Sequence, residues 1–430
     1  MINLYLFNEG SRAATYGIGT YIREMTNSLS CREDVSLNII QLVSDRKDFE
    51  IEKNIKFNIY HFPKSAFYID YKKSELYYRN IWYILRQHIK SSENERLVFH
   101  LNFAQEYPLI FLMKRDFPKC HTILTIHYQQ WCFTLNGSYS RFKKIISQDK
   151  EKLTLIEEET VYESYEKEKI LYLSIDTIIC LGNYAKDILM KDYNIPKEKI
   201  KVINHGISDE AVLLSSTKQK KMRQKLFIPE DEIVMVFVGR IDDMKGIDVL
   251  IEAFGSVVKD YPKCHLYIIG EGGNMNNYMN KAEYYWRKIT FTGRLKKEDV
   301  YKFYQVANIG ILPSRYESFG YVAIEMMMFN IPIIATKTSG LNEILTGEVD
   351  GYKIPIKEKD DKVIILSEDI KDCVIKKIMS KCKRKTKSRN TFLEKYTTKK
   401  MIELYIPLLY CEGIKQSAPK EIDLIKIRKV

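Results

Sequence analysis

The sequence predicts a protein of two doubly wound α/β domains, and three observations lead to this prediction. The chain has 430 residues, whereas a single hydrophobic core usually stops growing at roughly 250–300 residues. Hydrophobic residues make up 45% of the chain, which is enough for real cores. Short apolar segments also alternate with amphipathic ones in two successive series, as expected for parallel sheets covered by helices.

Seven segments of the first half are predicted to be strands because they are short, apolar and rich in β-branched or aromatic residues. Several of them are almost continuously hydrophobic, as buried parallel strands are. Helices are expected between most of them, for example at residues 20–29 and over the charged stretch 141–171. The predicted strands are residues 2–7, 36–43, 55–62, 96–102, 121–127, 177–182 and 201–206.

A second series of five strands follows a polar stretch, residues 207–230, that has no strand pattern. We therefore place the domain boundary there, with an N-terminal domain of residues 1–207 and a C-terminal domain of residues 208–395. Residues 396–430 are expected to form a helix and then a basic tail. The five predicted strands are residues 232–239, 265–270, 289–293, 309–313 and 332–336.

The composition excludes several classes of protein. The eight cysteines are scattered, without a CxxC or a Cys/His zinc spacing, which predicts reduced thiols. The first residues lack the pattern of a signal peptide, and no apolar run reaches the roughly 18 residues that a membrane-spanning helix needs. These observations predict a cytoplasmic protein.

The chain is basic, with a net charge of +12 and lysine clusters at residues 218–225 and 381–389. Such a charge suits an anionic partner, namely nucleic acid, acidic lipid or a phosphorylated small molecule. Each cluster taken alone fits a solvated helix face equally well. The charge therefore indicates a kind of partner without identifying it.

Two glutamates stand eight positions apart around a predicted strand–helix junction. The strand at residues 309–313 is followed by a loop that carries Glu317, and a helix that opens near Gly320 carries Glu325. Ligands of open α/β sheets bind beyond the carboxyl ends of the strands, and a helix N-terminus favours an anion such as phosphate. Both carboxylates are suited to accept hydrogen bonds from sugar hydroxyls. Alternatively, Glu317 completes a capping box with Ser314, and Glu325 pairs with a lysine.

Two cations stand at the first strand–helix junction of the second half. Arg240 follows the strand at residues 232–239, and Lys245 comes just before a helix that starts at Gly246. The planar guanidinium and the mobile ammonium are both suited to phosphate, so the pair is a candidate clamp for a diphosphate. Alternatively, the two cations pair at the surface with Asp242 and Asp243. These two adjacent acids are too few to indicate a metal site.

The first half offers a glycine-rich loop and a histidine at strand ends. Gly10, Gly17 and Gly19 follow the first strand, but Ile22 stands where a dinucleotide fingerprint would have its third glycine. The loop fits a close approach to phosphate or sugar, and it also fits a plain turn. His127 ends the strand at residues 121–127, where an imidazole can bind a sugar, assist proton transfer or serve a structural role.

These segments resemble the retaining glycosyltransferases of family 4, also called glycosyl transferases group 1, which have the GT-B fold. The resemblance is strongest from about residue 222 to 355, through VFVGRIDDMKG, YIIGEGG, FTGRL and PSRYESFGYVAIEMM. The spacing of Glu317 and Glu325 is the hallmark of that family. The N-terminal half is similar through GIGTYI, TIHY and ICLGNYAKDIL, and it departs from the family pattern at Tyr128, Gly182 and residues 205–208.

The resemblance implies a role for each matching residue. Catalysis would involve His127 and Glu317, no metal would be required, and the last helix would return to the N-terminal domain. The two domains would face a central cleft. The nucleotide base would lie near Gly270, Arg294 and Leu295. The donor would be bound by Gly19, Arg240, Lys245, Glu317, Phe319, Gly320, Tyr321 and Glu325.

The function expected from this resemblance is transfer of a sugar from a nucleotide-diphosphate sugar to a hydroxyl acceptor, with retained anomeric configuration. The acceptor would be a glycan or a lipid-linked molecule, and no cofactor would be needed. The basic clusters predict peripheral contact with an anionic membrane, at its inner face, rather than nucleic-acid binding. The alternatives are a phosphorylase or epimerase of the same fold, and a non-catalytic basic binding module.

Overall fold

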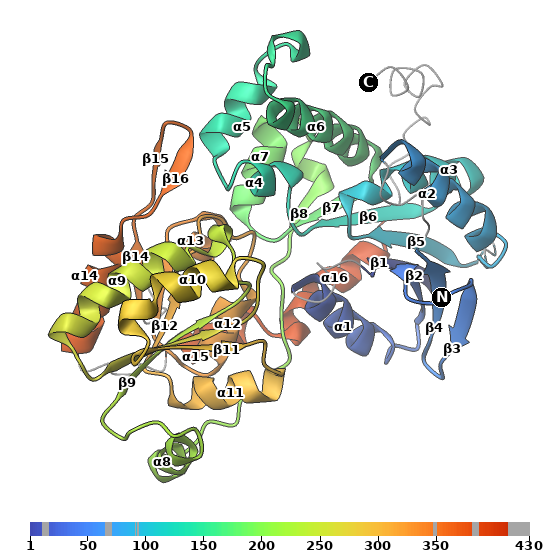
Figure 1. Cartoon of the computed structure of the whole chain (residues 1–430). Helices are drawn as coiled ribbons and strands as arrows, with labels where there is room; N and C mark the ends of the chain where they lie inside the picture. The colour runs from blue at the N-terminus through green and yellow to red at the C-terminus, as the bar shows by residue number, and fades with distance from the viewer. Residues whose placement is uncertain are drawn as a thin grey trace. The chain divides into compact units, whose positions relative to one another are not determined.

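The computed structural model describes residues 1–10, 17–64, 71–90, 92, 94–346, 351–380 and 387–411 (Figure 1). The chain divides into two compact units. Unit 1 contains Met1–Gln130, Gln148–Ser208 and the described residues from Thr398 onward. Unit 2 contains Trp131–Ser147 and Asp209–Thr397.

Unit 1 is built on an eight-stranded sheet with the order β3-β4-β2-β1-β5-β6-β7-β8. All neighbouring strands are parallel except for β3, which pairs antiparallel with β4 at the edge. The central strands are buried on both faces, which explains their continuous hydrophobic sequences. The strands are β1 (Ile2–Glu9), β2 (Val35–Ser44), β3 (Glu50–Lys53), β4 (Phe57–Pro63), β5 (Arg96–Leu101), β6 (His121–Ile126), β7 (Thr177–Cys180) and β8 (Ile200–Val202).

Helices connect the parallel strands of unit 1 and bury one face each. Helix α1 buries Ile18, Tyr21, Ile22, Met25 and Leu29, a spacing of three or four residues that places them on one side of the helix. The helices are α1 (Gly17–Leu29), α2 (Tyr71–Leu85), α3 (Tyr107–Asp116), α6 (Ile156–Ser174), α7 (Asn183–Lys191) and α16 (Thr398–Leu409), with 3-10 turns η3 (Ala104–Glu106), η4 (Lys150–Lys152) and η5 (Lys197–Lys199).

Unit 2 is built on a six-stranded, fully parallel sheet with the order β11-β10-β9-β12-β13-β14. A separate antiparallel hairpin consists of β15 (Lys357–Lys359) and β16 (Lys362–Ile364). The sheet strands are β9 (Ile233–Val238), β10 (Cys264–Ile269), β11 (Ile289–Gly293), β12 (Ile309–Leu312), β13 (Ile333–Thr336) and β14 (Gly351–Ile354).

The helices of unit 2 include two that come from the first half of the sequence, α4 (Gln130–Thr134) and α5 (Tyr139–Ile146). Gln130, the first residue of α4, still belongs to unit 1. The others are α8 (Ser216–Lys225), α9 (Ile247–Asp260), α10 (Met275–Lys281), α11 (Lys297–Val306), α12 (Tyr321–Met328), α13 (Ser339–Ile344), α14 (Ser367–Met379) and α15 (Lys387–Lys395), with 3-10 turns η6 (Asp243–Lys245) and η7 (Glu283–Tyr285).

Each sheet has a point at which the strand order reverses. In unit 2 the chain builds outward from β9 through β10 to β11, then returns to place β12 on the other side of β9. In unit 1 it builds from β1 toward β2, and later places β5 on the other side of β1. The loops that follow β9 and β12, and those that follow β1 and β5, therefore diverge and leave room for a ligand.

One carboxylate of unit 1 holds two of the four points at which the chain passes between the units, those at residues 208/209 and 397/398. Glu24 on α1 is buried and accepts hydrogen bonds from the Ser208 backbone N–H (3.1 Å) and hydroxyl (2.6 Å). It also accepts one from the Thr398 hydroxyl (2.6 Å), while the Thr398 N–H donates to the Ile207 carbonyl (3.1 Å). These two crossing segments are thus fixed to α1.

The predicted fold class is confirmed in its elements, because every one of the twelve predicted strands overlaps an observed strand. The sequence analysis did not predict β3, β14, β15 or β16, which are short edge or hairpin strands. The expected helix over residues 141–171 is instead two helices, α5 and α6, separated by η4.

The division into units differs from the predicted domains in one whole segment, and by one or two residues at the two later boundaries, because Ser208 lies in unit 1 and residues 396–397 lie in unit 2. Residues 131–147, expected in the N-terminal domain, pack with unit 2. Residues 412–430 of the predicted C-terminal helix lie outside the described residues, as do residues 381–386 of the second lysine cluster.

A buried carboxylate in unit 1 gives the fold a specific pH dependence. Glu168 on α6 is buried, and it accepts hydrogen bonds from the Gln130 backbone N–H (3.0 Å) and the Tyr193 hydroxyl (2.6 Å). Burial raises the pKa of Glu168 to about 7, although the two hydrogen bonds act in the opposite direction. The folded state therefore binds this proton more tightly than the unfolded state does.

We predict that Glu168 lowers stability as the pH rises from about 4.5, its ordinary pKa, to about 7. Relative to Glu168→Gln, the free energy of unfolding of the natural chain should fall by about 3 kcal/mol across this interval and then level off. Urea denaturation at several pH values measures this difference, with Glu159→Gln, an exposed glutamate in the first turn of the same helix, as the control. A pH-independent difference would contradict the prediction.

Candidate active site

The loop between β12 and α12 carries Glu317, and it is fixed by hydroxyl groups of the neighbouring strand and loop. The Ser339 hydroxyl is central, because it donates to the Glu317 carbonyl and also accepts from the Glu317 N–H (3.1 Å). The loop backbone therefore has little freedom. The hydroxyls of Thr336, Thr338 and Ser339 donate to the carbonyl oxygens of Ser314, Arg315 and Glu317, respectively.

A glycine ends this loop at the start of α12. Gly320 has φ 112°, in the left-handed region, and it is the N-cap of α12. A Cβ atom there would lie 2.9 Å from the Leu341 side chain, so a larger residue would require both strain and displacement. The absence of a side chain leaves the first N–H groups of α12 approachable, as anion binding at a helix N-terminus requires.

The loop between β9 and α9 packs directly against the end of β12. Gly246 has φ 65°, and a Cβ atom there would lie 2.1 Å from the Pro313 carbonyl oxygen. The Arg315 N–H donates to the Met244 carbonyl (2.8 Å), and its guanidinium binds both carboxylate oxygens of Asp248 (2.9 and 3.3 Å). Arg315 thus joins the two loops that flank the reversal point of the sheet.

These loops bring together one predicted cation and one predicted carboxylate. The Lys245 ammonium and the Glu317 carboxylate form an ion pair. Their side chains are only 19% and 24% exposed, so the pair is partly desolvated, although water still reaches it. Glu317 therefore pairs with Lys245, and the N-cap of α12 is Gly320 rather than Ser314, so the alternative of a capping box is not what the structure shows.

Arg240 lies at the end of β9 and makes a different pair. Its guanidinium lies 2.9 Å from the Asp242 carboxylate, which agrees with the alternative of a surface pair for this residue. It also lies over the ring of Phe133, 5.9 Å from the centroid. Arg240 remains about one-third exposed, so it can still reach a ligand.

Glu325 lies in the second turn of α12, as the sequence predicts. Its carboxylate accepts a hydrogen bond from the hydroxyl of Tyr304 (3.2 Å), a fully buried residue on α11. Burial raises the pKa of Tyr304, and the nearby Glu325 charge adds to this effect. A hydroxyl donor, the kind of group that a ribose also offers, is therefore one partner of this carboxylate.

The other predicted donor residues of unit 2 lie at the same edge of the sheet. Phe319 is buried and packs edge-to-face with Tyr321 at 5.7 Å. Gly270 follows β10, and its N–H donates to the Gly293 carbonyl at the end of β11 (3.0 Å). Two further predicted residues, Arg294 and Leu295, follow β11, and Arg294 pairs with Glu271 (3.3 Å).

The segment of residues 131–147, which the sequence analysis assigned to the N-terminal domain, lies against this site within unit 2. Gly137 has φ 81°, and a Cβ atom there would lie 2.8 Å from the Tyr316 Cβ atom. The Trp131 ring meets the Tyr316 ring edge-on, 5.6 Å between centroids. The aromatic stretch after the strand with His127 therefore packs on the loop of Glu317.

His127 lies in unit 1, at the end of β6, and is buried. Its Nε2 lies 3.0 Å from the Asn102 Oδ1, and its Nδ1 lies 3.2 Å from the His205 Nε2. Because the Asn102 amide N–H donates to the Phe7 carbonyl (2.8 Å), its oxygen faces His127. We infer that His127 carries its proton on Nε2 and accepts from His205. Burial lowers the pKa of His127 to about 3, so the ring is neutral.

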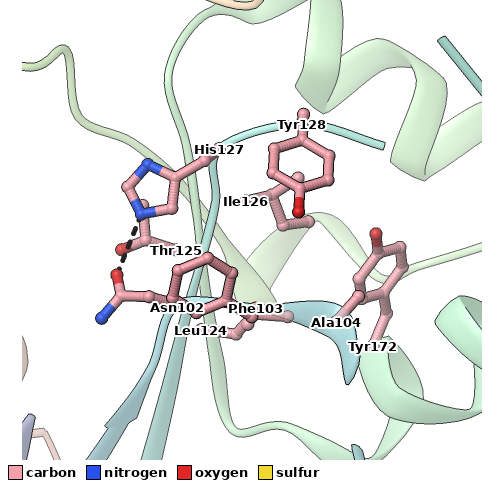
Figure 2. Close-up of a pocket in the computed structure, with 9 residues that line it drawn as sticks. All are labelled: Asn102, Phe103, Ala104, Leu124, Thr125, Ile126, His127, Tyr128 and Tyr172. Atoms are coloured by element: carbon pink, nitrogen blue, oxygen red, sulfur yellow. Dashed lines mark hydrogen bonds between the residues drawn. The ribbon is translucent and has the colours of Figure 1, made fainter. Parts of the chain in front are cut away.

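A small pocket lies beside His127 at the carboxyl ends of β5 and β6 (Figure 2). Three aromatic rings and several polar groups surround it, and its volume of about 10 Å³ has room for about one water molecule. Gly19, the remaining predicted residue, lies in the first turn of α1, after β1. The pocket is lined by Asn102, Phe103, Ala104, Leu124, Thr125, Ile126, His127, Tyr128 and Tyr172.

Sequence reasoning missed Asn102, Arg315 and Ser339. Asn102 follows a predicted strand, so the rule that ligands bind beyond strand ends could have singled it out. Arg315 stands in a motif that was recognised, and Ser339 lies within the range of the resemblance, but their roles depend on contacts with other loops. Among the described residues there is no group of three or more His, Cys, Asp or Glu side chains that could hold a metal ion, and no described helix is long and apolar enough to cross a membrane.

Comparison with known proteins agrees with this architecture. A family model described as Glycosyltransferase Family 4 matches residues 16–211, and one described as Glycosyl transferases group 1 matches residues 218–387. The sucrose-phosphate synthase structure from Thermosynechococcus elongatus superposes with a TM-score of 0.72 at 17% identity, covering 95% of this chain and 100% of that chain. The fold is therefore GT-B, with two Rossmann-like units.

Two curated relatives are similar mainly over part of their length. An uncharacterized glycosyltransferase of Methanocaldococcus jannaschii is 31% identical over 43% of this chain and 48% of its own. A mannosylfructose-phosphate synthase of Agrobacterium fabrum is 30% identical over 42% of this chain and 41% of its own. The matches thus span about half the length of these relatives. The chain belongs to the family 4 (group 1) glycosyltransferases, in agreement with the resemblance found in the sequence.

We predict that Ser339→Ala loosens the Glu317 loop, because it leaves the N–H and the carbonyl of Glu317 without their hydroxyl partner. The free energy of unfolding should fall by about 1–3 kcal/mol, and the thermal shift produced by a nucleotide-diphosphate sugar should shrink. The matched control is Ser147→Ala, which removes an exposed hydroxyl that donates only to the Lys144 carbonyl (2.9 Å). Equal changes of the unfolding free energy and of the thermal shift in Ser339→Ala and Ser147→Ala would show that Ser339 does not position the loop.

Proposed function

We propose that the protein transfers a sugar from a nucleotide-diphosphate sugar to a hydroxyl acceptor, with retention of the anomeric configuration. Family membership supports this proposal, and so do the names of relatives that synthesise sugar phosphates. The single observation that carries it is the Lys245–Glu317 pair at the reversal point of the unit 2 sheet. One member suits a phosphate and the other suits sugar hydroxyls.

The proposed donor site uses charges that the fold already holds in place. As the glycosidic bond breaks, negative charge grows on the leaving diphosphate. Lys245, Arg240 and the N-terminus of α12 supply positive charge there, so the reaction needs no further cofactor in this proposal. Glu317 binds the transferred sugar and Glu325 binds the ribose. Donor binding thus replaces the Lys245–Glu317 ion pair with two contacts to the donor. Lys245 then binds the diphosphate, and Glu317 binds the sugar.

We place the acceptor in unit 1, with one hydroxyl group directed at the small pocket beside His127, which is too small for a whole sugar ring. The rings of Phe103, Tyr128 and Tyr172 offer apolar faces, and Asn102 and His127 offer polar groups (Figure 2). Because His127 is neutral and both of its ring nitrogens are hydrogen bonded within the protein, its proposed role is to fix the Asn102 side chain beside the acceptor rather than to act as a strong base. The acceptor would be a glycan or a lipid-linked molecule.

The proposed location is a reducing compartment such as the cytoplasm. The seven cysteines in the described part of the chain are thiols, and five of them are buried. A peripheral position at an anionic membrane would fit the basic composition and a lipid-linked acceptor. Neither part of this proposal affects the chemistry of the donor site.

A screen of the purified full chain against UDP-, GDP- and ADP-sugars tests the proposal. A donor should raise the melting temperature and should be hydrolysed slowly when no acceptor is present. Turnover that requires inorganic phosphate, or isomerisation of the sugar nucleotide alone, would favour a phosphorylase or an epimerase. Binding of nucleic acid without any response to sugar nucleotides would favour a non-catalytic module.

We predict that Lys245→Ala and Glu325→Ala each lower kcat/KM for the donor by about 10²–10³-fold, because each removes a fixed charge from the donor site. Lys245→Arg, which keeps the charge, should lose less. The variants should remain folded because both sites still admit water. Lys302→Ala, which removes an exposed lysine paired with Asp299, is the control. Undiminished turnover in both alanine variants would contradict the site assignment.

A further inference from the structure

The amino-terminal edge of the unit 2 sheet presents large aromatic side chains to solvent. Phe227 is 94% exposed in the loop before β9, and Tyr284 (90%) and Trp286 (68%) are exposed in the segment before β11. Because the sheet is parallel, these segments lie at the edge opposite to the loops of Arg240, Lys245 and Glu317. The aromatic residues are therefore outside the candidate active site.

Phe227 occupies a position where its residue type is doubly unfavourable. The Ile228 N–H donates to the Arg223 carbonyl (2.9 Å) and the Phe227 N–H to the Gln224 carbonyl (3.1 Å), which is a Schellman cap of α8. Phe227 takes the left-handed position of this cap, with φ 57°, where glycine is usual. A strained backbone that holds an apolar ring in water lowers stability, so Phe227 is a candidate for a role in binding.

The position of Phe227 is fixed by the helix that precedes it. The Arg223 guanidinium donates to the carbonyl oxygens of Pro229 and Glu232, both at 2.9 Å, and to the Asn308 side chain at 3.0 Å. The end of α8 is thereby held against the sheet. The Phe227 ring is consequently presented outward from a rigid support.

The second aromatic pair is anchored in a similar way. Tyr285 lies between the two exposed residues and packs on α9, where a Cβ atom at Gly255 would lie 2.4 Å from its ring. With Tyr285 turned inward, its neighbours Tyr284 and Trp286 are turned outward. Arg287 lies over the Trp286 ring, 5.2 Å from the centroid, so an aromatic ring and a cation are presented together.

The loops that carry these residues are neighbours along the edge. The Ile233 N–H donates to the Lys263 carbonyl (2.8 Å), and the Leu266 N–H donates to the Lys288 carbonyl (2.9 Å), which joins the segments before β9, β10 and β11. Residues 216–232, 261–263 and 281–288 carry nine lysines and arginines but only four acidic residues. The edge is therefore strongly positive as well as aromatic.

We propose that this edge, named here the amino-edge patch, binds an anionic membrane surface. A bilayer interface accepts aromatic rings from several convex loops at once, beneath a plane of phosphates that attracts the cations. The proposal concerns a surface remote from the donor site and does not depend on the transfer reaction. The patch consists of Phe227, Tyr284 and Trp286 with Lys218, Lys220, Lys221, Lys225, Lys263, Arg287 and Lys288.

The tryptophans allow a direct test on the full chain without any substrate. The chain has three tryptophans, and two of them, Trp82 (0% exposed) and Trp131 (1%), are buried. A change in tryptophan fluorescence when the protein surface moves from water into lipid therefore comes from Trp286. Vesicles of equal parts phosphatidylglycerol and phosphatidylcholine should shift the emission to shorter wavelength. Brominated lipid should quench it, and Trp286→Phe should abolish both effects.

Phe227→Gly separates membrane binding from stability. Glycine relieves the strained cap, so the midpoint of urea denaturation should rise, while co-sedimentation with the anionic vesicles should weaken about tenfold, the order expected for one lost phenylalanine side chain. Ile55→Ser, which removes a fully exposed apolar side chain from unit 1, is the matched control and should bind as the natural chain does. Slow donor hydrolysis should be unchanged in all three variants.

Four outcomes would overturn the proposal. The first is that the natural chain binds pure phosphatidylcholine vesicles as well as it binds anionic ones. The second is that Phe227→Gly and Trp286→Phe both bind anionic vesicles as the natural chain does. The third is that Trp286 fluorescence responds to polyuridylate but not to vesicles. The fourth is concentration-dependent self-association that Phe227→Gly abolishes in the absence of vesicle binding. The last two would assign the amino-edge patch to single-stranded RNA or to a second copy of the chain.

Discussion

The ion pair between Lys245 and Glu317 is the interaction on which the candidate active site depends. Two opposite charges, each about one-fifth to one-quarter exposed, hold each other at the reversal point of a parallel sheet. Each group satisfies the other only until a ligand offers a phosphate and hydroxyls. A nucleotide sugar offers both, and under the proposed function this is the reason why one site keeps a cation and a carboxylate in contact.

Contacts between the neighbouring loops of unit 2 hold Lys245 and Glu317 in position. Gly246 lets the β9–α9 loop touch the end of β12, and Arg315 ties the two loops together through Asp248 and the Met244 carbonyl. Ser339 fixes the backbone of Glu317 from the next strand end. The conformational entropy of these side chains and loops is thus lost on folding, before a ligand binds. Such preorganised charges are the condition for electrostatic catalysis.

The strands were predictable because each is a short apolar run. Lys245, Glu317 and Glu325 could then be placed near the carboxyl ends of the strands, because each follows a predicted strand in the sequence. The short edge strand β3 and the hairpin β15–β16 were not predictable, because their pattern is weak and polar. The packing of residues 131–147 on the Glu317 loop was missed because it depends on a close approach at Gly137. The environment of His127 depends on Asn102 and His205, which are distant in sequence.

The central claim is that Lys245 exchanges Glu317 for the diphosphate of the donor. Calorimetric titration of Glu317→Gln with the nucleoside diphosphate of the preferred donor tests this most directly. The account predicts tighter binding of the nucleoside diphosphate than in the natural chain, because the competing carboxylate is gone, together with slower sugar transfer. Unchanged or weaker binding of the nucleoside diphosphate would contradict it.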